Sequence, residues 1–80
     1  MANIRLTRTV EYVDGKKYQV TTTWSPSSRS IRGQSAPIVT TIYSDYQLIY
    51  TLKSHFKDRV TQTDLENEQM FAIKDAFPSY

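Results

Sequence analysis

The chain has 80 residues, a formal net charge of +2, no cysteine and an apolar fraction of 39%. This length predicts one small domain, with a core so thin that self-association would be a natural way to add buried area. The absence of cysteine excludes disulfides, iron–sulfur clusters and thiol chemistry. No apolar run reaches membrane-spanning length and the N-terminus lacks a signal-peptide core, so we expect a soluble, cytoplasmic protein without membrane contact.

Positive charge is concentrated in the first part of the chain. Residues 1–34 carry six basic side chains against two acidic ones, whereas residues 35–80 carry four basic against six acidic. A basic segment favours an anionic partner. Its charge is nevertheless less dense than that of a dedicated nucleic-acid binder.

The alternation of residue types predicts an antiparallel β-hairpin in residues 4–24. In residues 4–12 and 18–24, the large apolar side chains stand at even positions. The odd positions of the two strands are polar, which is typical of a sheet with one solvated face. The apolar set comprises Ile4, Leu6, Val10, Tyr12, Tyr18, Val20 and Trp24.

The turn of this hairpin is predicted at Asp14-Gly15, a strong hairpin signal. A two-residue loop would place apolar side chains opposite polar ones, although cross-strand partners share a face. A three-residue loop over residues 13–15, with Gly15 left-handed, brings all the large apolar side chains to one face. We therefore expect the three-residue loop, whose pairs include Val10 with Tyr18 and Ile4 with Trp24.

A flexible loop is predicted for residues 25–36, which are rich in serine and contain Pro26 and Gly33. After this loop, Pro37 opens a third strand over residues 38–43, where β-branched residues dominate. No internal repeat and no second-domain boundary is present, so residues 1–80 are expected to form one domain.

Two helices are predicted from their capping patterns. Ser44-Asp45-Tyr46-Gln47 fits a Ser-x-x-Gln capping box, and Thr63-Asp64-Leu65-Glu66 fits a Thr-x-x-Glu one. The first helix is expected over residues 45–59 and the second over residues 64–77, where Pro78 stops it. The expected buried residues are Leu48, Ile49, Leu52 and Phe56 in the first, and Leu65, Met70, Ile73, Ala76 and Phe77 in the second.

The expected fold class is therefore α+β. A three-stranded antiparallel sheet, made of the hairpin and one further strand, is covered on one face by two C-terminal helices in the order β-β-β-α-α.

The residue inventory predicts neither an enzyme nor a metal or cofactor site. His55 is the sole histidine and there is no cysteine, so the usual zinc and redox-metal ligand sets cannot be built. Gly15 and Gly33 are isolated, so no phosphate-binding glycine loop is present. The alternating acidic residues Asp64, Glu66 and Glu68 point in different directions on a helix, and they fit the preference of a first helical turn for negative charge.

A protein-binding surface is predicted on the first helix. At about 100° per residue, one strip would hold Tyr46, Tyr50, Lys53 and Lys57, and tyrosines of this kind are common interface anchors. Phe71 projects away from Ile73 on the second helix and is expected to be exposed. We therefore expect a small non-enzymatic binding protein that occupies a surface of a protein partner, in the manner of phage or mobile-element proteins that modulate or inhibit host machinery.

Two alternatives remain open. The first is a nucleic-acid-binding module, in which the Thr-rich hairpin face touches DNA as a β-ribbon. Its binding residues would be Arg5, Arg8, Lys16, Lys17, Arg29 and Arg32. The second alternative is a structural or assembly subunit, a homo-oligomer for which the exposed sheet edge offers a pairing site.

Overall fold

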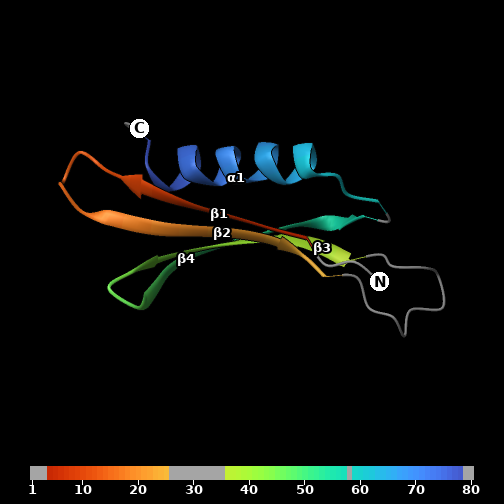
Figure 1. Cartoon of the computed structure of the whole chain (residues 1–80), viewed down its shortest axis with the longest axis horizontal. Coiled ribbons are helices and arrows are strands. Elements are labelled where there is room, and N and C mark those ends of the chain that lie inside the picture. The colour runs from red at the N-terminus through yellow and green to blue at the C-terminus, as the bar shows by residue number, and fades with distance from the viewer. Residues whose placement is uncertain (1–3, 26–35, 58, 79–80) are drawn as a thin grey trace.

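The computed structural model describes residues 4–25, 36–57 and 59–78, with only the backbone described for residues 55–57. These described residues form four strands and one helix: β1 (Ile4–Glu11), β2 (Lys17–Trp24), β3 (Ala36–Ser44), β4 (Gln47–Lys57) and α1 (Gln62–Ala76). The strands form one antiparallel sheet in the order β1-β2-β3-β4. Helix α1 lies along one face of this sheet (Figure 1).

The hairpin of β1 and β2 has the predicted register. Val10 pairs with Tyr18 and Ile4 with Trp24, which confirms the three-residue loop. Gly15 is left-handed, with φ of 82°. The Asp14 carboxylate closes the turn because it accepts hydrogen bonds from the Lys16 amide at 2.9 Å and the Tyr18 hydroxyl at 2.7 Å.

The prediction of a helix over residues 45–59 is wrong, because this segment forms a turn followed by strand β4. Asp45 and Tyr46 have φ of 53° and 65°, and Ser44 pairs with Gln47. Two central residues at positive φ make a tight hairpin turn that matches the twist of the flanking strands. The Ser-x-x-Gln pattern is therefore a turn and not a helix cap, and the sheet has four strands covered by one helix.

Strand β3 begins at Ala36, one residue inside the predicted loop. The rest of that loop, residues 26–35, lies outside the described residues, and so do Arg29 and Arg32. Two irregularities interrupt the pairing of β3 with β4. Ile49 is an extra residue between two paired positions, and residues 54 and 55 of β4 face the single residue Ile38.

The C-terminal helix is confirmed, but its cap lies two residues before the predicted one. Thr61 is the N-cap: its hydroxyl accepts from the Asp64 amide at 3.2 Å, and the Asp64 carboxylate accepts from the Thr61 amide at 2.8 Å. The predicted residues Leu65, Ile73 and Phe77 are buried, whereas Met70 and Ala76 are only half-buried. The inward stripe also contains Gln69 and Ala72, which were not predicted.

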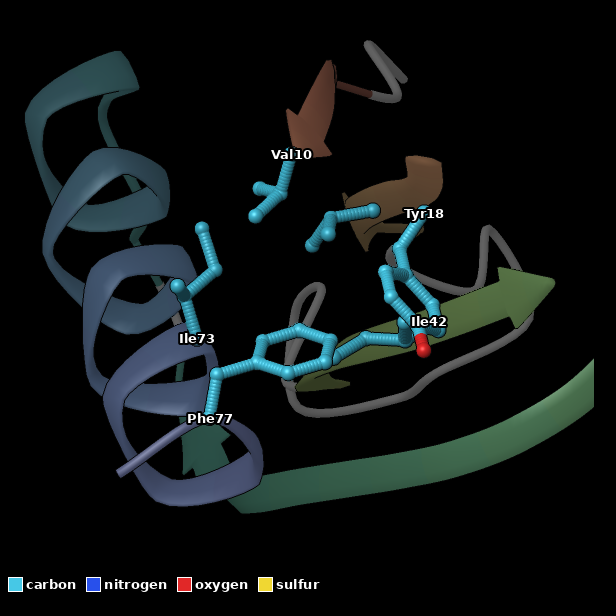
Figure 2. Packing of buried hydrophobic residues seen from close by; sticks show 6 residues of the cluster. Val10, Tyr18, Ile42, Ile73 and Phe77 are labelled. Carbon is cyan, nitrogen blue, oxygen red and sulfur yellow. The ribbon is translucent and has the colours of Figure 1, made fainter. Parts of the chain in front are cut away.

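The core consists of two apolar clusters on the helix-covered face of the sheet. The larger cluster contains Val10, Tyr18, Val20, Ile42, Ile73 and Phe77 (Figure 2). The ring of Phe77 packs against Tyr12 and Tyr18, with ring centroids 4.7 and 4.8 Å apart. The smaller cluster contains Trp24, Ala36, Ile38 and Leu65.

A buried polar layer separates the two clusters. The hydroxyl groups of Thr22 and Thr40 are hydrogen-bonded to each other at 2.8 Å. Gln69, which is fully buried, donates from its Nε2 to the Leu6 carbonyl at 2.9 Å. Its Oε1 has no hydrogen-bond partner among the described residues. Gln69 therefore fixes the helix above the strands through a backbone contact that an apolar side chain cannot make.

We expect Gln69→Glu to lower the free energy of unfolding by about 3 kcal/mol at neutral pH, because it buries a carboxylate next to a carbonyl oxygen. The deficit should shrink as the pH falls, since the protonated carboxyl can donate to the Leu6 carbonyl. Urea unfolding at acidic and neutral pH measures both effects. Gln69→Met is the matched control and should change stability by only about 1 kcal/mol. Equal losses in the two variants would show that Gln69 acts only by filling space.

Candidate partner-binding surface

The five residues predicted to bind a partner do not share one strip, because β4 replaces the helix on which four of them were placed. Tyr46 lies in the turn between β3 and β4, and Tyr50 faces α1. Lys53 lies in β4 and is exposed, and the side chain of Lys57 lies outside the described part. Phe71 lies on α1 and is 63% exposed, as predicted.

Tyr50 is a structural residue of the helix-covered face. It packs against the larger core cluster, and its hydroxyl donates a hydrogen bond to the Asp75 carboxylate near the end of α1. Burial, followed by this hydrogen bond, raises the pKa of Tyr50 to about 12. The residue therefore ties β4 to the helix, and its hydroxyl is already used within the chain.

The basic residues predicted for nucleic-acid binding do not converge. Arg5 pairs with Thr23 near one end of the sheet and Lys17 pairs with Glu11 near the other. Arg8 pairs with Val20, whose side chain is buried under the helix, so it lies on the opposite face from Arg5. Lys16 lies in the turn between the two strands. The other two predicted residues, Arg29 and Arg32, lie outside the described residues.

Charge is divided between the two layers of the molecule. Helix α1 carries four acidic side chains (Asp64, Glu66, Glu68 and Asp75) against Lys74 alone. The described side chains of the two hairpins include five basic ones against three acidic ones. Among the described residues, the sheet therefore has an excess of basic side chains and the helix an excess of acidic ones.

The face of the sheet that α1 does not cover is lined with threonines. Thr7 pairs with Thr21, Thr21 with Thr41, and Thr41 with Thr51, so one row of threonines crosses all four strands. We call this the open face. Its neighbouring rows contain Arg5, Thr23, Val39 and Lys53 on one side and Thr9, Gln19, Tyr43 and Leu48 on the other.

A hollow of about 520 Å³ lies on the open face where β3 turns into β4, lined by Lys17, Gln19, Tyr43, Asp45 and Tyr46. We call these five residues the turn-end surface. Tyr46 is fully exposed and Tyr43 is 39% exposed. The surface offers two tyrosine rings, an amide and side chains of both charge signs, which suits binding by contact area and hydrogen bonds.

The turn-end surface was only partly visible in the sequence. Tyr46 and Lys17 were singled out, each for a different function, while Gln19, Tyr43 and Asp45 were missed. Asp45-Tyr46, flanked by strand-forming residues, could have been recognised as a two-residue hairpin turn. Such a turn would have brought Tyr43 and Tyr46 to the same end of the sheet.

No family model, curated protein or solved structure matches the chain. Among the described residues, no group of histidine, aspartate and glutamate side chains could hold a metal ion. The same part of the chain contains no helix long and apolar enough to span a membrane.

We expect the Tyr50–Asp75 contact to make stability depend on alkaline pH. The pKa of Tyr50 is raised from 10.0 to about 12 in the folded state. Its protonated phenol therefore stabilises the fold fully below pH 10, and this contribution is lost as the pH rises through about 12. Urea unfolding of the wild type and of Tyr50→Phe over this range measures the effect.

The difference in stability between the two proteins should narrow as the pH rises. Tyr18, whose pKa is also raised by its hydrogen bond to Asp14, is present in both proteins, so its titration cancels in this comparison. A difference that stays constant up to pH 12 would contradict the role assigned to Tyr50.

Proposed function

We propose that the protein is a small non-enzymatic binding protein that occupies a surface of a protein partner through the turn-end surface. The observation that carries this proposal is the conformation of Tyr46. Its side chain is fully exposed, yet its backbone is held at φ of 65°. Left-handed positions of a hairpin turn favour glycine, asparagine or aspartate.

A tyrosine at such a position costs about 1–3 kcal/mol of backbone strain. Because the ring is fully exposed, burial within the chain does not offset this cost. Backbone strain of this kind is typical of binding and switch sites, where it lowers stability but holds a residue in the conformation that its function needs. Binding of a partner over the ring would offset the free-energy cost of the strain, because tyrosine gives a large, stiff contact area with a polar tip.

The chemistry of the turn-end surface favours a protein over a nucleic acid. Asp45 lines the hollow together with Lys17, so a phosphate backbone would meet a carboxylate beside the only lysine of the lining. Arg5 and Arg8 lie along β1, away from this end of the sheet, and Lys16 lies in the neighbouring turn between β1 and β2. A protein surface can pair with both charges, whereas a polyanion can pair with only one.

The proposed mode of action is occlusion. Covering a partner's surface modulates or inhibits that partner without chemistry. Phe71 is the other exposed aromatic residue of the predicted set, but it lies on α1 and lines a different groove.

We expect Tyr46→Gly to raise the free energy of unfolding by about 1 kcal/mol, since it relieves the strained turn, and to abolish partner capture. Thermal unfolding measures the first effect. For the second, the immobilised variants are incubated with extract of the cells that produce the protein, and retained proteins are identified by mass spectrometry.

Tyr46→Phe is the matched control, because it keeps the ring and the backbone strain but loses the hydroxyl. It should retain the captured protein that Tyr46→Gly loses. The nucleic-acid alternative is tested with labelled random DNA and RNA at low and moderate salt. Micromolar, salt-sensitive binding that survives Tyr46→Gly, together with no Tyr46-dependent capture, would overturn the proposal.

A further inference from the structure

The two outer edges of the sheet differ in how they are protected. Strand β1 carries three charged residues, Arg5, Arg8 and Glu11, within eight positions. From Gln47 to Ser54, β4 carries one, Lys53. No strand in the described part of the chain pairs with the outer edge of β4. Charged side chains are a usual protection against edge-to-edge pairing, so β4 is the less protected edge.

Apolar side chains accompany this edge on both faces of the sheet. Leu48 and Ile49 are 49% and 47% exposed. A groove of about 400 Å³ lies at this edge, between β4 and α1, and is lined by Leu52, Lys53, Ser54, Glu68 and Phe71. Helix α1 packs mainly against β1, β2 and β3, so Leu52 is only half-buried and Phe71 stays exposed.

Pairing along this edge is restricted to a short segment. The irregularities at Ile49 and at residues 54–55 bound the regular part of β4, residues 50–53. Bulges bend a strand and raise its twist, so a new strand can align regularly only between them. The edge therefore accepts a short partner strand and disfavours open-ended stacking.

We propose that a second copy of this chain occupies the edge, with the two β4 strands antiparallel about a two-fold axis at Thr51. This register places Thr51 opposite Thr51 of the second copy on the open face. It also places Tyr50 opposite Leu52 of the second copy on the helix side, so that apolar side chains meet. The two sheets become one, and its threonine row runs without interruption from Thr7 of one copy to Thr7 of the other.

Repulsion between the two Lys53 side chains favours an axis at Thr51 over an axis at Leu52. With the axis at Thr51, the two Lys53 side chains lie four residues apart along the strands, roughly 13 Å. An axis at Leu52 would bring them to two residues apart, roughly 7 Å, where like charges on one face repel. Both arrangements place the two helices on the same face, where each Phe71 borders the seam beside Leu52.

The test is the oligomeric state of the whole chain. Sedimentation equilibrium of the wild type should give twice the 9.3-kDa chain mass at high micromolar concentration. Thr51→Lys places two like charges at the axis and should weaken self-association at least tenfold. Thr51→Glu should do the same, and an equimolar mixture of the two variants should restore a dimer.

Thr7→Lys is the matched control, because Thr7 lies in the same row and is also exposed, but at the β1 edge. It should dimerise like the wild type. Circular dichroism checks that all variants keep their strands, which the exposure of both positions predicts. A monomeric wild type at several hundred micromolar would overturn the proposal, as would a Thr51→Lys variant that dimerises as well as Thr7→Lys or charge variants that fail to recombine.

This dimer is independent of the turn-end surface. Tyr46→Gly should leave the measured mass unchanged, so a failure of the dimer and a failure of the proposed function are distinguishable.

Discussion

The tight turn at Asp45 and Tyr46 holds both residues at positive φ and sends the chain back along β3. Strand β4, the open face and the unpaired edge all depend on this reversal. Without it, residues 47–57 could not pair with β3. The same two residues line the turn-end hollow, so the feature that sets the topology also presents the candidate site.

The helix is held on the sheet by two kinds of contact. Ile73 and Phe77 contribute to the larger apolar cluster and Leu65 to the smaller one, but apolar contacts alone tolerate sliding. Gln69 donates hydrogen bonds to the carbonyls of Leu6 and Val20, and these directional contacts specify a position. The Oε1 of Gln69 has no hydrogen-bond partner among the described residues, and a buried polar atom of this kind lowers stability.

The sequence predicts the first hairpin well because two local signals agree there. Alternation defines the faces, and Asp14-Gly15 defines the register. For residues 45–59 the local signals conflict. Leu48, Ile49, Leu52 and Phe56 fit helical spacing, while Tyr50 and Leu52 alternate with Thr51 and Lys53 as in a strand. Pairing with β3 decides between them, and that contact is invisible to local periodicity.

The candidate site was harder to predict than the hairpin for the same reason. The exposure of Phe71 follows from helical geometry, which was correctly predicted for that segment. The turn-end surface instead joins β2 to residues about 25 positions later in the chain. Only the register of β2 with β3, which pairs Gln19 with Tyr43, brings these residues together.

The charges of the described residues produce an electric moment directed across the two layers, from the acidic helix to the basic sheet. In a dimer whose two-fold axis is perpendicular to the sheet, the components along that axis add and those within the sheet cancel. Such a particle orients in the field of a charged surface: the open face turns toward negative charge and the helices turn away. Orientation of this kind would decide which side of the protein a large anionic assembly meets first.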